Sequence, residues 1–374
     1  MGHISMRRLL SFSFVLLLQL CQATIDAADS SKPIEADILL KGGTVVDGSG
    51  SKGKVGNVAI KDDKIVGVGS FRVKSVKQEI NCEGLIIAPG FIDLHNHSDS
   101  QIVTPKLRAN VNYLTQGCTT IVTGNCGSGP VDVSEYLAKI DADGAGTNVA
   151  HLLPQGSLRA NVLGTAQRAA KPAEIAKMRE LADKAMRDGA WGMTTGLIYV
   201  PSSYADTDEL TEIAKVVGKH GGIYASHIRG EGKNLLEAVQ EALKIGREAK
   251  CPIHISHFKA SGEDAWGLVR PASEMIEAAR KEGLVVTADQ YPYIASSTSL
   301  DATLLPTWSL AGGREKLIER LNDKKQSARI RDFVAKKLDQ ARDGAAIKLT
   351  SYSAKPAWVG RSLAEIAESE NTKP

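Results

Sequence analysis

The chain has 374 residues, 43% of them hydrophobic, so it can bury a large core, and its length favours one large domain with an appendage. Its 46 Lys and Arg residues nearly balance 43 Asp and Glu residues, and a net charge of only +3 gives no indication of a nucleic-acid partner. The charges are interleaved rather than gathered in blocks, which excludes a charged interaction tail.

The N-terminus has a different composition from the rest of the chain. Arg7-Arg8 precedes the apolar run 9–20, and small residues follow as far as Ala28. This order is typical of a secretory signal, and the apolar run is too short to span a membrane comfortably. We therefore expect residues 1–28 to be a signal peptide and the protein to be secreted or periplasmic, with no stable membrane span after cleavage. An uncleaved anchor is the alternative.

Residues 35–87 read as short strands joined by tight turns, which predicts a small β unit with too little core to stand alone. The expected strands are 38–40, 44–46, 58–60 and 65–68, and the expected turns are Gly42-Gly43, Asp47-Gly48 and Asp62-Asp63.

After Pro89 the pattern changes to strands that alternate with helices. Buried strands are expected at 91–97, 119–122, 149–153, 192–195, 223–226, 253–256 and 285–288. Helices are expected at 171–188, 207–220, 234–249 and 271–281, with a charged helical region at 314–343. This gives seven βα units, one short of a closed eightfold barrel. The segment 345–349 has only a weak strand pattern, so we predict no eighth barrel strand.

Histidine and cysteine residues recur where the predicted strands end. His95 and His97 follow the apolar run 85–94, and residues two apart on a strand project to one face. Cys126, His227 and His257 each close an apolar run and open a polar loop. Because a parallel barrel gathers such strand ends at one mouth, they predict a metal site. Imidazoles and a thiolate suit zinc best without excluding other transition metals.

The other cysteines and histidines read as structural. Four cysteines spread over residues 29–374 do not form a disulfide framework, and we expect Cys82, Cys118 and Cys251 to be small buried hydrophobic residues. His254 has odd parity relative to His257, so we expect it to face the outer helices.

Seven segments of the chain read LKGGTVVDG (40–48), APGFIDLHNHSD (88–99), GNCG (124–127), GLIYVP (196–201), SHIRGE (226–231), ISHFK (255–259) and DQYPY (289–293). Together they resemble the N-acyl-D-amino-acid deacylases (D-aminoacylases) of the amidohydrolase superfamily. The resemblance implies an α/β fold: a (β/α)8 TIM-like barrel of the amidohydrolase type in residues 88–374, incomplete at its C-terminal end. It also implies that residues 35–87 are the N-terminal part of a small β-sandwich unit.

The resemblance further implies a zinc enzyme that hydrolyses the amide of a small N-acyl-D-amino acid to a carboxylate and a free D-amino acid. Cys126, His227 and His257 match the ligands of one tight zinc site, and His95 and His97 match ligands of a second, weaker site. The positions that match substrate-binding residues are Tyr199, Lys259, Tyr291 and Ser297.

One part of the family pattern is missing. The family's proton-carrying aspartate and an arginine for the substrate carboxylate follow the last barrel strand, and we find no such segment here, so the catalytic residue is unassigned. Asp99 and Asp289 lie near strand ends but do not match that role; Asp289 is expected to hold the loop after the seventh strand. We therefore expect feeble or no turnover from these 374 residues.

Two other functions stay open. A cyclic-amide hydrolase of the dihydroorotase or hydantoinase type is one, although its bridging lysine is absent from the fourth strand segment 189–196. A truncated, inactive zinc-binding homologue is the other.

Overall fold

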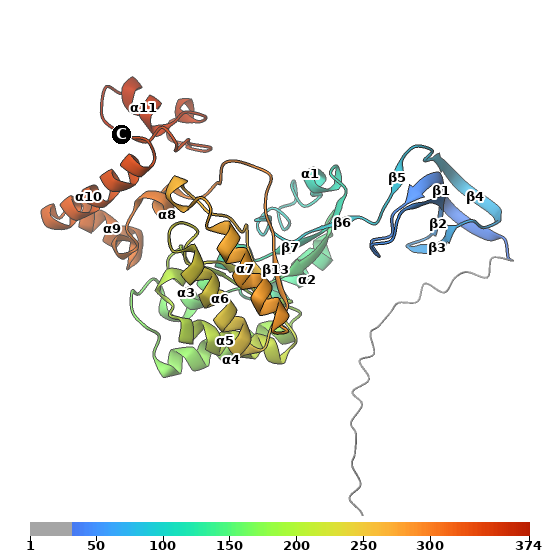
Figure 1. The fold of residues 1–374 in the computed structure, drawn as a ribbon, viewed down its shortest axis with the longest axis horizontal. Helices are drawn as coiled ribbons and strands as arrows, with labels where there is room; N and C mark the ends of the chain where they lie inside the picture. The colour runs from blue at the N-terminus through green and yellow to red at the C-terminus, as the bar shows by residue number, and fades with distance from the viewer. Residues whose placement is uncertain (1–31) are drawn as a thin grey trace, which may run out of the picture. The chain divides into compact units, whose positions relative to one another are not determined.

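The computed structural model describes residues 32–374, which form two compact units that divide between Pro89 and Gly90 (Figure 1). The expected signal peptide, residues 1–28, lies outside the described residues. Within residues 32–374, no helix has the length and apolar character needed to cross a membrane.

The first unit is one five-stranded sheet. Its strands are β1 (Ile34–Val45), β2 (Lys54–Lys61), β3 (Lys64–Gly69), β4 (Val73–Asn81) and β5 (Ile86–Ile87). The order is β3-β2-β1-β4, and β5 also pairs with β1. β2 is antiparallel to both β1 and β3, whereas β4 and β5 run parallel to β1. Two small apolar clusters, one around Leu39 and Ala59 and one around Val58 and Ile87, are its core.

The sequence predicted two features of this sheet wrongly. Gly42-Gly43 does not turn the chain but lies inside β1, where the register with β2 shifts between Leu40 and Gly43. Gly42 has φ +75°, so the local conformation is a bulge that a glycine accommodates. Strand β4 was not predicted, because its mostly exposed side chains carry no apolar alternation. The turn at Asp62-Asp63 joins β2 to β3 as expected.

The second unit contains seven successive strand positions along residues 90–374, all paired in parallel. β6 (Phe91–Asp93), β7 (Cys118–Thr123) and β8 (Asn148–His151) form one sheet. The other sheet consists of β9 (Leu153–Pro154), β10 (Gly192–Gly196), β11 (Ile223–His227), β12 (Ile253–Ile255) and β13 (Val286–Ala288). Only Leu152 separates β8 from β9, so the two sheets meet at one interrupted strand. β6 and β13 are the two ends of this series.

Helices follow the strands in the order expected for βα units (Figure 1). They are α1 (Val111–Leu114), α2 (Val133–Asp143), α3 (Gln155–Leu163), α4 (Pro172–Arg187), α5 (Thr207–Lys219), α6 (Leu235–Ala249) and α7 (Val269–Lys281). The main core lies between these helices and the second sheet and includes Met193, Tyr224 and Ile253, each at most 1% exposed. Its apolar burial is the main stabilising contribution to this unit.

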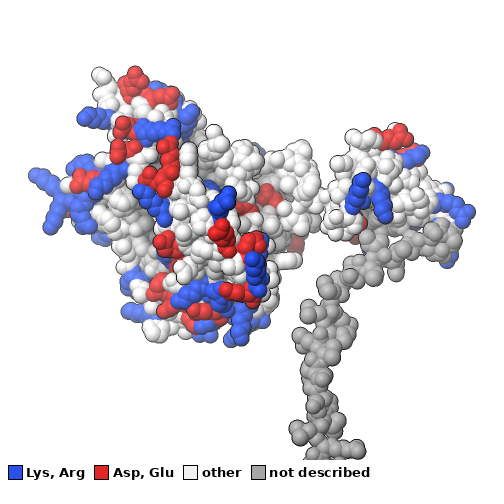
Figure 2. All heavy atoms as spheres, viewed as in Figure 1, with Lys and Arg blue, Asp and Glu red and all other residues white. Residues whose placement is uncertain are grey.

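The charged region near the C-terminus is helical, as predicted. Its helices are α8 (Leu300–Leu304), α9 (Gly313–Asn322), α10 (Lys324–Gln340) and α11 (Leu363–Ser369). Short 3-10 turns complete the chain: η1 (Asn125–Gly127), η2 (Ser202–Tyr204), η3 (Glu263–Ala265), η4 (Thr307–Leu310) and η5 (Pro356–Trp358). Residues 345–349 form only an isolated bridge, Lys348 to Ser362, rather than a barrel strand. Basic and acidic side chains are interspersed over the helices of this unit (Figure 2).

Candidate metal centre

The five predicted ligands come together where β6, β7, β11 and β12 end. The Sγ atom of Cys126 lies 3.3 Å from Nε2 of His95 and 3.8 Å from Nε2 of His257. Nε2 of His257 in turn lies 2.9 Å from Nδ1 of His227. Two overlapping groups result, each with its ligand atoms within 4.8 Å of one another: His95, His97 and Cys126, and Cys126, His227 and His257. The thiol of Cys126 is therefore common to both groups.

The loop that carries Cys126 is held by backbone contacts. Cys126 lies in η1 with φ 53° and ψ 31°, a left-handed conformation that is uncommon for a residue other than glycine. Gly124 precedes it with φ +84°, and a Cβ atom there would collide with the carbonyl oxygen of Leu152. The Gly124 N–H donates to Oδ1 of Asp99 over 2.6 Å, and its carbonyl accepts from Oγ1 of Thr194 over 2.5 Å. These contacts fix where the sulfur points.

The electrostatics of the cluster favour positive charge at its centre. Burial alone would raise the pKa of the Cys126 thiol, but the surrounding imidazoles of His227, His257, His95 and His97 lower that pKa to about 2. Burial lowers the pKa of His95, whereas its contacts with Asp289 and Cys126 raise it to about 10. The Cys126 thiolate and the Asp289 carboxylate thus stabilise a proton on His95, between them, and the same place suits a metal cation.

Two carboxylates support the ligands from outside the cluster. Oδ2 of Asp289 lies 2.7 Å from Nδ1 of His95, and Oδ1 accepts a hydrogen bond from the backbone N–H of His257. Oε1 of Glu231 lies 2.7 Å from Nδ1 of His257 and 2.7 Å from Nζ of Lys259. Carboxylates that accept from the second ring nitrogen are the usual partners of metal-binding histidines, because they fix the tautomer and the ring orientation.

His254 does not face the outer helices, and that prediction was wrong. Its Nε2 lies 3.2 Å from Oδ2 of Asp289, and its Nδ1 lies 2.8 Å from Oγ1 of Thr287. Its neighbours Ile253 and Ile255 belong to the core between the sheet and the helices. Because side chains alternate along a strand, His254 must point to the opposite face.

The residues present fit a borderline-soft divalent ion such as zinc. Nε2 of His227 is buried and has no hydrogen-bond partner among the described atoms, although the residue is only 5% exposed. A buried nitrogen of this kind is costly unless something occupies its lone pair or accepts its proton. Together with a thiolate and further imidazoles, it completes the donor set that zinc prefers.

The predicted substrate-binding residues differ in how close they lie to the ligand cluster. The ring of Tyr199 lies 5.2 Å from that of His227, and its hydroxyl lies 2.8 Å from Oγ1 of Thr298. Nζ of Lys259 lies 5.5 Å from the ring centroid of Tyr291. Ser297 is exposed, and its neighbour Thr298 is the residue that meets Tyr199. The roles of these side chains in substrate binding stay predictions.

Sequence reasoning missed Glu231 and Thr298 as members of the site. Glu231 lies four residues after His227, in the loop that opens where β11 ends, so its position just beyond a ligand-bearing strand was an available signal. Thr298 lies in the segment between β13 and α8, which carries no periodic pattern, and no sequence signal identifies it.

Comparisons with known proteins agree with this arrangement. A model of the amidohydrolase family matches residues 78–295. The D-aminoacylase of Alcaligenes xylosoxydans xylosoxydans is 38% identical over 289 residues, which cover 71% of this chain and 59% of the relative. The chain thus spans about three fifths of the length of this curated relative.

Two solved structures are similar to most of the chain. One is an N-acyl-D-glutamate deacylase from Bordetella bronchiseptica in complex with zinc and a phosphonate inhibitor that mimics the tetrahedral intermediate. It is 29% identical with a TM-score of 0.76, over 91% of this chain and 68% of that one. The other is a D-aminoacylase whose binuclear metal centre is described in terms of one-metal activation and second-metal attenuation. It is 31% identical with a TM-score of 0.74, over 90% and 68% of the two chains.

The matched region covers more than half of the 374 residues and includes all five histidine and cysteine residues of the cluster. The chain belongs to the amidohydrolase family.

Proposed function

We propose that this chain forms a zinc-dependent hydrolase that cleaves the amide bond of N-acyl-D-amino acids, releasing a carboxylate and a free D-amino acid. The observation that carries the proposal is the Cys126 thiolate, which is shared by two overlapping groups of histidines. The similar D-aminoacylase has a binuclear centre in which one metal activates and a second attenuates, and two unequal groups around one sulfur suit that behaviour. Cys126, His227 and His257 would hold the tight ion, and His95 and His97 would complete the weaker site.

Lys259, Glu231 and Tyr199 each have a chemical task in this reaction. Zinc, when bound, supplies a Lewis acid that makes a coordinated water acidic and polarises an amide carbonyl. Lys259 provides a cation next to the ligand cluster, and a cation there suits the carboxylate that every N-acyl amino acid carries. Glu231 neutralises that cation in the structure and so orients it toward the cluster. The phenol of Tyr199, beside His227, can donate a hydrogen bond to a bound substrate.

The alternative cyclic-amide hydrolases are disfavoured by the same site. A bridging lysine on the fourth strand is what that class would need, and β10 has the sequence GMTTG. Cys126, in η1 just after β7, instead belongs to both histidine groups. We also propose export to the periplasm or the medium, which the pattern of residues 1–28 supports.

Metal content and turnover together test this function. We would purify the parent protein, Cys126→Ala and Cys251→Ala, measure bound zinc by elemental analysis, and assay N-acetyl-D-amino acids beside hydantoins. Cys251 is also a buried cysteine, but it lies in the core between the sheet and the helices, so its variant controls for loss of a buried sulfur. We expect about one tightly held zinc in the parent and in Cys251→Ala, and its loss in Cys126→Ala.

The outcomes separate the candidate functions. Turnover of acyl-D-amino acids without turnover of hydantoins supports the proposal, even where it is as feeble as we expect of these 374 residues. Turnover of hydantoins alone assigns the chain to the cyclic-amide class. Zinc retention without any turnover assigns it to the inactive zinc-binding homologues, and zinc that survives Cys126→Ala removes the thiolate from the site.

A further inference from the structure

We propose that Asp289 is a positioning residue that ties the two ligand groups together, so that the His95, His97 and Cys126 subsite depends on its carboxylate. The inference rests on the metal site of the proposed function and deepens it. Asp289 follows β13, the last strand of the series, whereas His95 follows β6, the first. The contact between them joins residues 194 positions apart and connects the two ends of the strand series.

Each oxygen of Asp289 serves a different ligand group. Oδ2 lies 2.7 Å from Nδ1 of His95, a ligand of the first group, and Oδ1 accepts from the backbone N–H of His257, a ligand of the second. The backbone of Asp289 is itself held by β12 and the residues after it. Its N–H donates to Ile255 O over 3.3 Å, and its carbonyl accepts from Phe258 N over 2.9 Å. These backbone hydrogen bonds hold Asp289 in place independently of its contacts with the two ligands.

The contact with His95 selects a tautomer. An ionised carboxylate can only accept, so in the neutral, metal-binding form of His95 the proton stays on Nδ1 and the lone pair of Nε2 is free to bind an ion. That Nε2 is the atom that lies 3.3 Å from Sγ of Cys126.

The contact with His257 acts on the main chain instead. His257 has φ +38°, which lies in the left-handed region that side chains other than glycine rarely adopt. A conformation of this kind persists only when surrounding contacts hold it, and the Asp289 carboxylate accepts its N–H. One side chain thus fixes a ring in one ligand group and a backbone in the other.

Asparagine at this position separates the two contacts. It offers one acceptor oxygen and one NH2 group in place of two oxygens. The His257 N–H can only donate, so it keeps the oxygen, and the NH2 group then faces Nδ1 of His95. His95 must accept there and move its proton to Nε2, which removes the lone pair that faces Cys126. Asp289→Asn is therefore expected to weaken the His95 subsite and to spare the other.

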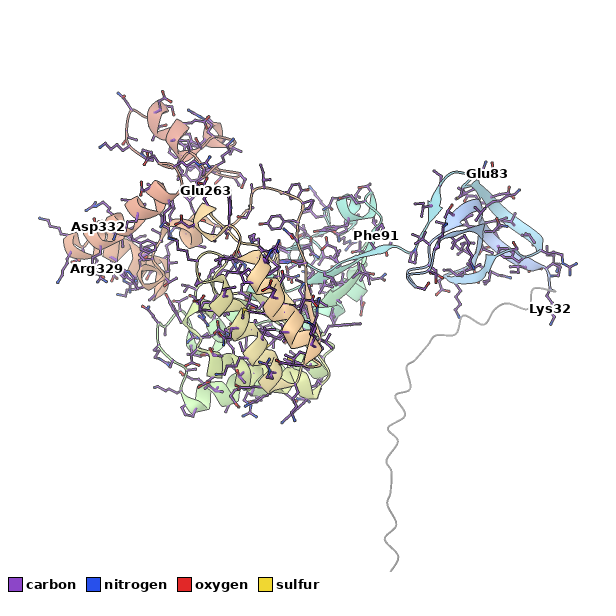
Figure 3. The ribbon with its side chains drawn as sticks, in the orientation of Figure 1. Lys32, Glu83, Phe91, Glu263, Arg329 and Asp332 are labelled. Atoms are coloured by element: carbon purple, nitrogen blue, oxygen red, sulfur yellow. The ribbon has the colours of Figure 1, made fainter. Side chains whose placement is uncertain are left out.

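Glu231 is the matched contrast, because its ion-pair contacts are with His257 and Lys259 rather than with His95 or His97. Glu231→Gln should weaken the tight site first. Asp332→Asn is the neutral control, since Asp332 is exposed on α10 (Figure 3).

The test is a titration of six metal-free proteins with Co²⁺: the parent, Asp289→Asn, Glu231→Gln, Asp332→Asn, His95→Gln and the double variant of Asp289→Asn with His95→Gln. Binding is measured by calorimetry and by the thiolate-to-cobalt absorption band. We expect two binding events in the parent and in Asp332→Asn. In Asp289→Asn the first event should stay within about twofold of the parent, and the second should weaken by about 10- to 100-fold, the usual range for loss of a ligand's carboxylate partner. His95→Gln should reproduce that loss, and the double variant should add nothing further.

Several results would overturn the inference. They are two parent-like events in Asp289→Asn, an equal loss of both events, an additive double variant, or a parent that saturates with one ion. A parent that binds no cobalt would instead refute the proposed function, and the inference with it. If Asp289→Asn does not fold, ¹⁵N-imidazole NMR of the metal-loaded parent decides: a proton on Nδ1 of His95 supports the assignment, and a proton on Nε2 contradicts it.

Discussion

Oε1 of Glu231 lies 2.7 Å from Nδ1 of His257 and thereby leaves Nε2 of that ring facing Cys126 and His227. Burial raises the pKa of Glu231, but His257 and Lys259 together lower it, so the carboxylate is ionised at neutral pH. The same oxygen also lies 2.7 Å from Nζ of Lys259. A proposed ligand of the tight site and the cation proposed to bind substrate therefore share one partner.

Replacing Glu231 with glutamine should affect both functions of that oxygen. The amide carries no charge, so Lys259 loses its counter-charge, and His257 becomes a weaker ligand because no carboxylate lies beside its Nδ1. We expect zinc affinity at the tight site to fall by about 10- to 100-fold, measured by competition with a chelator. Glu263→Gln is the control, because Glu263 lies at the surface and pairs with Arg342 (Figure 3). Equal affinities in the two variants would contradict the role of Glu231.

The Cys126 thiol should show no titration near its ordinary pKa. A lowered pKa means that the charged form persists to lower pH, so the thiolate is present throughout the neutral range. We expect the ultraviolet thiolate absorbance of the metal-free parent, minus that of Cys126→Ser, to be constant from pH 5 to pH 9 (roughly the range around an ordinary thiol's midpoint). A difference that rises through about pH 8.5 would show an ordinary thiol.

Gly124→Ala should destabilise the protein more than Gly221→Ala, although both glycines have positive φ. Both Gly124 and Gly221 have positive φ, +84° and +74°, so an alanine at either position is strained. Only at Gly124 does the added Cβ collide with backbone, whereas nothing lies within 4 Å of it at Gly221. We expect Gly221→Ala to cost about 1 kcal/mol of unfolding free energy and Gly124→Ala about 1–3 kcal/mol more. Gly124→Ala should also lose bound zinc, which Gly221→Ala should retain.

The buried ion pair of Arg159 and Glu209 should be sensitive to the loss of one partner. Nε of Arg159 lies 3.0 Å from Oε1 of Glu209, and the two side chains are 0% and 1% exposed. Burial is the largest influence on Glu209 and raises its pKa against the opposing effect of Arg159. We expect Arg159→Met to lower the unfolding free energy by about 3–5 kcal/mol, because it leaves an uncompensated buried charge.

Adding Glu209→Leu to Arg159→Met should restore much of that loss, since the double variant leaves no buried charge. Denaturant unfolding of the two single variants and the double variant measures the coupling between the two sites. A double variant less stable than Arg159→Met would show that the pair is not what stabilises this part of the structure.

Local patterns were sufficient to predict the order of the parallel strands after Pro89 and the clustering of the candidate ligands. Cys126, His227 and His257 were identified because each closes an apolar run, and the carboxyl ends of parallel strands meet at one edge of the sheet. His254 was assigned to the wrong face because its parity was counted from His257. Strand β12 ends at Ile255 and His257 has left-handed backbone, so the alternation does not extend to His257.

The sequence by itself determined which residue types lie at the strand ends and how many parallel strands alternate with helices. Only the tertiary structure decided that one sulfur serves two histidine groups, that Glu231 joins His257 to Lys259, and that Asp289 reaches across to His95. The reason is physical: periodicity is a property of a few neighbouring residues. A contact of 2.7 Å between residues 194 positions apart depends on how every intervening strand and helix packs.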